Sequence, residues 1–276
     1  MMLPGGKRQG QLIPHQTLKT RQRAEREQWP SQLALRVHRA LSWLDRAERS
    51  SDDDGRFVFL WIAFNAAYAA DTGPTRPVEA QRFSEFLGRL ASLDERGRLP
   101  ELIWRRYSSA IRLLLTNKYV FQPYWDHQNG AEDAGDWEER FSKANAAAHA
   151  ALGRHDTGAV LSIVFSRLYT LRNQLLHGGA TWNSGINREQ LRDGSAILGD
   201  VVPVLIKVMM DLSGQRLGEP SYPLPSYIRI VFASSRILSK RETDSDTELH
   251  HPLMWPPFVI AENGDDAAQI MVQGPC

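Results

Sequence analysis

The chain has 276 residues, of which 42% are apolar and 24% charged, with 33 basic and 32 acidic side chains. These are the values of an ordinary globular protein, and they argue against wholesale disorder, a collagen-like repeat or a disulfide-framed miniprotein. The single cysteine, Cys276, can form no internal disulfide or thiolate metal cage, and the formal net charge of +1 lacks the signature of a dedicated duplex-DNA binder.

The charge is spread unevenly along the chain. Residues 1–50 carry 10 Lys and Arg against 4 Asp and Glu, net +6, whereas residues 241–276 carry 1 against 7, net −6. The basic end could contact nucleic acid, or the two ends could attract each other. No stretch is apolar and long enough for a signal peptide or a membrane span, which predicts a cytoplasmic protein without a membrane partner.

Apolar spacing predicts helices through most of residues 29–215. Residues 1–28 have little of that spacing, and we expect them to be a flexible basic arm that becomes helical near its end. Apolar side chains then recur at three- and four-residue steps over residues 33–44, and residues 57–70 are apolar on nearly all sides, as in a buried central helix. Further helices are predicted over 79–93, 100–115, 137–152 and 187–212.

An aromatic-rich segment, residues 117–135, interrupts these helices and is expected to be a loop. It contains Tyr119, Phe121, Tyr124 and Trp125. These rings could stack on unpaired nucleic-acid bases, although packing against the helices is the simpler interpretation.

After Gly218 the composition changes to a proline-rich linker, and residues 227–233 then alternate like a strand. The expected fold class is therefore mainly α. It consists of a flexible arm (1–28), a helical bundle (29–215), and a linker with a small C-terminal β appendage (216–276).

The strongest helix signal covers residues 157–177 and ends in the sequence LRNQLLHGG. Asp156 and Thr157 supply N-cap chemistry, and Gly178 is a natural C-cap. Spacings of four, three and four residues place a set of polar side chains in one stripe along the helix. The stripe consists of Ser166, Thr170, Asn173 and His177.

Arg172 lies at the edge of this stripe, five residues before His177. On an α-helix that spacing is about 140° around the axis and about 7.5 Å along it, so the two backbones do not share a face. The long arginine side chain can still swing toward the histidine. Alternatively, the two groups can meet across a two-fold interface between copies of this helix.

These side chains suit acid–base chemistry on a phosphate. His177 lies in the last helical turn, where the helix dipole favours the imidazolium, and it can exchange protons near neutral pH. Arg172 can hold a phosphate with its planar fork of donors, and Asn173 can orient the imidazole or a substrate oxygen. Together they suit cleavage of RNA by its own 2′-hydroxyl, with no metal or other cofactor. Trp182 and Asn183 could line the same site or only close the loop.

A structural interpretation of the same residues stays open. A histidine at the end of a helix commonly serves as a cap, and Arg172 could simply bind a carboxylate. Spacing alone does not decide between these interpretations.

Two segments together resemble the HEPN superfamily, specifically its Apea-like branch. They are LRNQLLHGG at residues 171–179 and FLWIAFNAAY at residues 59–68. Arg172 to His177 match the family's motif of arginine, polar residue, short spacer and histidine. The apolar segment is similar to the buried helix that commonly precedes the motif, and the resemblance covers residues 30–215.

The resemblance implies a dimerising α-helical bundle in which two copies of the motif face one cleft. Many such proteins are metal-independent endoribonucleases of toxin–antitoxin, abortive-infection or other defence systems, whereas others are non-catalytic interaction or nucleotide-binding modules. It therefore implies Arg172, Asn173 and His177 as catalytic residues, RNA as substrate, a homodimer, and an antitoxin or defence partner. Some toxins of the superfamily carry a modifiable tyrosine where this chain has Gly179, so that control is not expected here.

Overall fold

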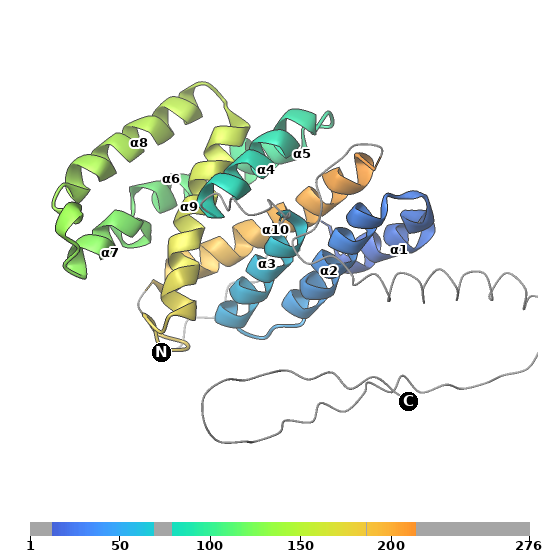
Figure 1. Ribbon diagram of the computed structural model, residues 1–276, viewed down its shortest axis with the longest axis horizontal. Coiled ribbons are helices and arrows are strands. Elements are labelled where there is room, and N and C mark those ends of the chain that lie inside the picture. Colours follow the sequence, from blue (N-terminus) through green and yellow to red (C-terminus); the bar gives the residue numbers. More distant parts are fainter. Residues whose placement is uncertain (1–12, 69–78, 186, 214–276) are drawn as a thin grey trace, which may run out of the picture. The chain divides into compact units, whose positions relative to one another are not determined.

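The computed structural model describes residues 13–68, 79–185 and 187–213 (Figure 1). All of them belong to the first of the two units into which the chain divides, residues 1–223 and 224–276. The α-helices of the described part are α1 (His15–Glu25), α2 (Ser31–Glu48), α3 (Asp53–Tyr68), α4 (Glu79–Leu93), α5 (Arg98–Glu101), α6 (Ser108–Thr116), α7 (Gln122–Gln128), α8 (Trp137–Gly153), α9 (Thr157–Leu176) and α10 (Arg188–Asp211). Short turns of 3₁₀ helix are η1 (Arg26–Gln28), η3 (Lys118–Val120) and η4 (Glu132–Ala134), and η2 (Leu102–Arg106) is a π turn. The mainly α prediction is confirmed for these residues, which include no strand.

Helices α2 and α3 pack along each other as a hairpin, because only four residues connect them. The apolar spacing of α2 places one face in the core. That face consists of Leu33, Val37, Ala40, Leu41 and Leu44, none more than 3% exposed. Helix α3 is buried on most sides, as its composition predicts, and its first turn carries Asp53 and Asp54, which favour a helix N-terminus.

An aromatic cluster joins α3, α4 and α9. Trp61 lies at its centre, and its ring centroid is 5.5 to 6.4 Å from those of four neighbours: Phe64, Phe83, Phe165 and Tyr169. Farther along the same helix pair, a Cβ added to Gly158 would lie 3.2 Å from the Cα of Gly88. Small residues at one end and interlocked rings at the other therefore fix α9 against α4.

Helix α10 is almost entirely buried between Ile197 and Ile206 and contains Pro203. It packs on α3 and approaches α9 closely at Gly194, where an added Cβ would lie 2.8 Å from Leu168 Cδ2 and 3.1 Å from Phe57 Cε2. α10 therefore contacts both α3 and α9.

Two local expectations are wrong, whereas the helix expected near the end of the N-terminal arm is present. Residues 13–28 form α1 and η1 and are anchored by Leu18, which is 1% exposed. The helix expected over 100–115 is split into α5, η2 and α6, and the expected loop 117–135 contains the helix α7. Residues 1–12 and the predicted linker and β appendage, 216–276, lie outside the described residues.

An acidic side chain ties α1 to two other helices. Asp211, at the end of α10, pairs with Arg21 of α1 and with Arg98 of α5, the latter at 2.7 Å. Burial would raise the pKa of Asp211, but the hydrogen bonds and charges of the two arginines outweigh it and lower that pKa below its usual 3.8. The charged form is therefore favoured in the folded state.

Asp211→Asn is expected to lower the free energy of unfolding near neutral pH by about 1 kcal/mol or less, since this carboxylate is partly solvated. A carboxyl group with a lowered pKa stabilises above its unfolded value and loses that effect as the pH falls through its folded value. The difference between Asp211→Asn and the wild type should therefore shrink below about pH 4. Urea denaturation across pH, with Asp193→Asn as a surface control, measures it; a difference independent of pH contradicts the assignment.

Candidate functional site

The motif helix α9 begins and ends where its sequence predicts. Asp156 caps the start and accepts a hydrogen bond from the Ala159 N–H at 3.0 Å. At the other end His177 occupies the C-cap position, and its N–H donates to the Asn173 carbonyl at 2.9 Å. Gly178 follows with φ +73°, a left-handed conformation that glycine adopts without strain. His177 is therefore fixed as the last residue before the chain turns.

Gln174, inside the motif, organises the chain after this turn. Its backbone carbonyl accepts from the Ala180 N–H at 3.1 Å, and its side-chain amide donates to the Tyr119 carbonyl at 2.7 Å. Its side-chain oxygen accepts from Asn187 Nδ2 at 2.8 Å. One glutamine thus connects α9 to η3 and to the start of α10, a role that our sequence analysis did not assign.

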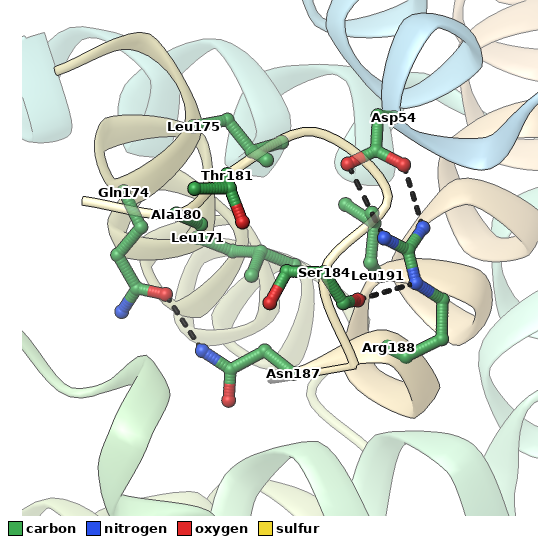
Figure 2. Close-up of a pocket in the computed structure, with 10 residues that line it drawn as sticks. All are labelled: Asp54, Leu171, Gln174, Leu175, Ala180, Thr181, Ser184, Asn187, Arg188 and Leu191. Carbon is green, nitrogen blue, oxygen red and sulfur yellow. Dashed lines mark hydrogen bonds and ion pairs between the residues drawn. The ribbon is translucent and has the colours of Figure 1, made fainter. Parts of the chain in front are cut away.

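A small pocket lies under this turn (Figure 2). Its lining residues are Asp54, Leu171, Gln174, Leu175, Ala180, Thr181, Ser184, Asn187, Arg188 and Leu191. An ion pair of 2.6 Å between Arg188 and Asp54 closes one side, and Arg188 also donates to the Ser184 carbonyl at 2.9 Å. The space inside is large enough for only about one water molecule. The polar groups of its lining therefore bond to one another rather than to a ligand.

The predicted site residues lie on the opposite side of α9 from this pocket. At about 100° per residue, Leu171, Gln174 and Leu175 span an arc of about 100° facing the pocket. The arc of about 140° on the other side contains Arg172, Asn173, Leu176 and His177. The exposed Leu176 lies in this arc, and half of its surface is accessible.

The structure brings Arg172 and Asn173 together. Arg172 Nη1 donates to Asn173 Oδ1 at 2.8 Å, and the guanidinium carbon lies 5.4 Å from the centroid of the Tyr169 ring. Arg172 Nε is buried and has no hydrogen-bond partner among the described residues. The guanidinium is therefore oriented by Asn173 and Tyr169, and its buried Nε–H is unsatisfied among the described residues.

His177 is exposed, and within the described part of the chain no side chain hydrogen-bonds to its imidazole. The structure thus unites two of the three predicted catalytic residues and leaves the third open to solvent. The predicted polar stripe holds for Ser166, Asn173 and His177, but Thr170 is only 3% exposed.

Trp182 and Asn183 lie in the loop after the glycine pair. Trp182 is 75% exposed, the most exposed large apolar side chain of the described residues, and Asn183 has φ +56°. Neither lines the pocket, whereas the next residue, Ser184, does. The loop closes over the pocket through Ser184 and presents Trp182 outward.

A buried arginine attaches the aromatic segment to α9. The guanidinium carbon of Arg167 lies 4.4 Å from the Phe121 ring centroid and 5.5 Å from that of Phe141. Arg167 is 3% exposed, and burial lowers its pKa to about 10, so it stays protonated at neutral pH. The expected packing of the aromatic segment against the helices is confirmed for Phe121, whereas Tyr119 remains 44% exposed.

In the described ranges, no three His, Cys, Asp or Glu side chains gather as a metal site would require. No helix within these ranges is both long and apolar enough to cross a bilayer. The chain matches no protein-family model, no curated protein and no solved structure.

Proposed function

We propose that this protein is a homodimeric, metal-independent endoribonuclease of the HEPN type. The carrying observation is the outer arc of α9, which contains the hydrogen-bonded pair Arg172–Asn173 and the exposed His177, whose imidazole bonds to no side chain of the described residues. The opposite side of the helix is filled by the protein itself. This arrangement supports a role for the motif residues in contacting a molecule from outside the chain.

The proposed reaction is transesterification of RNA. One His177 removes the proton of a 2′-hydroxyl, whose oxygen attacks the adjacent phosphorus. Arg172 stabilises the negative charge that develops on the phosphoryl oxygens. The 5′-oxygen leaves with a proton from an imidazolium, which gives a 2′,3′-cyclic phosphate and a 5′-hydroxyl. One imidazole cannot be base and acid at once, so two copies of His177 in one cleft supply both roles.

Trp182 and Asn183 are proposed to contact the RNA beside this cleft. An exposed indole can stack on an unpaired base, and the Trp182 ring is largely free to do so. A cytoplasmic location is part of the proposal. The toxin–antitoxin or phage-defence role that the resemblance implies is part of the proposal, as is an antitoxin or defence partner.

A non-catalytic HEPN dimerisation or interaction module is the second candidate. It is favoured by the imidazole of His177, which has no orienting partner in the described residues. Incubation of the purified full chain with an RNA pool in chelator separates the two. Cleavage to cyclic-phosphate ends supports the nuclease, and an intact dimer that cleaves no RNA supports the interaction module.

Leu176→Asp is expected to convert the dimer to a monomer at micromolar concentration. Leu176 lies between the backbones of Arg172 and His177 in the outer arc and is 50% exposed, so a shared cleft would bury it. Light scattering coupled to size exclusion measures the mass. Leu113→Asp on α6 is the matched control, because Leu113 is 68% exposed and lies on another helix. A wild-type monomer would remove the basis of the two-copy cleft.

A further inference from the structure

Three aromatic rings surround the amino group of Lys118. Its Nζ lies 5.4 Å from the ring centroid of Tyr119, 5.2 Å from that of Tyr124 and 5.9 Å from that of Trp137. The rings meet nearly edge to face, at 90° for the two tyrosines and 77° for Tyr124 and Trp137. This set, here called the aromatic cage, draws on η3, α7 and α8.

The charge of Lys118 is met by ring faces rather than by an acid. Among the described residues, no carboxylate pairs with Lys118, and its side chain is half-buried. An ammonium within about 6 Å of a ring centroid is attracted by the negative face of the ring. Three such rings around one nitrogen form an arrangement that suits a cation, and the Lys118 ammonium fills it.

The segment that forms the cage carries a net negative charge. Residues 117–143 carry six Asp and Glu against three Lys and Arg, net −3. Arg140 pairs with Asp136 and Lys143 with Glu139, which leaves Lys118 as the remaining lysine or arginine of the segment. A segment with a net negative charge repels phosphate and attracts cationic groups, so the charge favours a basic protein segment over RNA at this cage.

We propose that the aromatic cage binds a lysine or arginine side chain of a basic segment in a partner protein, and that Lys118 is a tethered occupant which yields to it. The lysine stem is flexible, and a partly exposed cation–π contact is weak, so exchange is feasible. The proposal does not depend on nuclease activity. The cage is also connected to the turn at His177, because the Gln174 side chain donates a hydrogen bond to the Tyr119 carbonyl.

The test uses the full chain with its tryptophans replaced by 5-fluorotryptophan, and Trp137→Phe identifies the Trp137 resonance in the fluorine spectrum. Titration with a short oligolysine peptide, at constant ionic strength, is expected to shift that resonance saturably. Tetramethylammonium chloride, compared with sodium chloride, is expected to shift it as well, since the cage accepts the cation itself.

Lys118→Ala is the decisive variant. The Lys118 side chain competes with the peptide for the cage through a weak cation–π contact. Its removal is therefore expected to tighten oligolysine binding about three- to sixfold. Lys143→Ala is the matched control, because it removes the same charge from α8 outside the cage. Tyr124→Leu is expected to weaken binding while circular dichroism stays unchanged.

Three outcomes overturn the proposal. In the first, the Trp137 resonance does not respond to either cation. In the second, Lys118→Ala and Lys143→Ala tighten binding equally, which would show attraction by net charge alone. In the third, an oligouridylate shifts the resonance and oligolysine does not, which would make the cage a base-stacking surface. All readouts are binding measurements, so failure of RNA cleavage leaves them intact.

Discussion

His177→Ala is expected to slow RNA cleavage about 10²- to 10⁴-fold, the usual contribution of a general acid–base group. The imidazole is exposed and bonded to no side chain of the described part, so its removal leaves the folded state essentially unchanged. Single-turnover cleavage of a labelled RNA in chelator measures the effect. The wild type should show a bell-shaped pH profile, because one copy must be neutral and the other protonated.

Arg172 provides an independent arm of the same experiment. Arg172→Lys keeps the positive charge but loses the planar fork, so a large loss of rate would point to bidentate phosphate binding rather than to charge alone. His149→Ala on α8 is the matched control for His177→Ala, because His149 is exposed and lies outside the motif. Cleavage that survives both His177→Ala and Arg172→Ala would rule out the proposed chemistry.

Trp61→Ala is expected to lower the free energy of unfolding by about 3–5 kcal/mol, the range for truncation of a buried aromatic side chain. Trp61 is 1% exposed, and its ring contacts Phe64, Phe83, Phe165 and Tyr169. Its loss opens a cavity where α3, α4 and α9 meet. Chemical denaturation followed by circular dichroism measures the change.

Two comparisons make the Trp61 prediction specific. Trp61→Phe should cost at least about 2 kcal/mol less than Trp61→Ala, since it keeps most of the ring volume and removes a buried Nε1–H that has no acceptor in the described residues. Trp182→Ala, at a 75% exposed indole, should change stability by less than about 0.5 kcal/mol. Equal losses at Trp61 and Trp182 would contradict the assigned core.

Local patterns were sufficient to predict the elements that position the site. The apolar spacing of α2 and α4 set their extent, and the Asp156 cap and Gly178 turn set the ends of α9. These signals lie within a few residues of the structure that they specify. The position of His177 at the helix end follows from the same local chemistry.

Features that depend on distant partners were not predictable in this way. Gln174 resembles any polar helical residue, and its significance comes from the Tyr119 carbonyl, 55 residues earlier in the chain. In the sequence Arg167 resembles a solvated surface residue, yet its guanidinium lies against the rings of Phe121 and Phe141. α1 buries only Leu18 and Gln22, too few positions to produce an apolar period. In each case tertiary contacts override a weak local pattern.

The separation of the two sides of α9 has a consequence for how this protein can change. Substitutions at Leu171 or Leu175 alter the intramolecular fit, whereas a substitution at the exposed Leu176 mainly alters the surface that the molecule presents to a partner. Because the Leu176 side chain does not line the pocket, its effect should combine additively with those of Leu171 and Leu175. Specificity can therefore drift in evolution, or be redesigned, without a compensating adjustment of the interior.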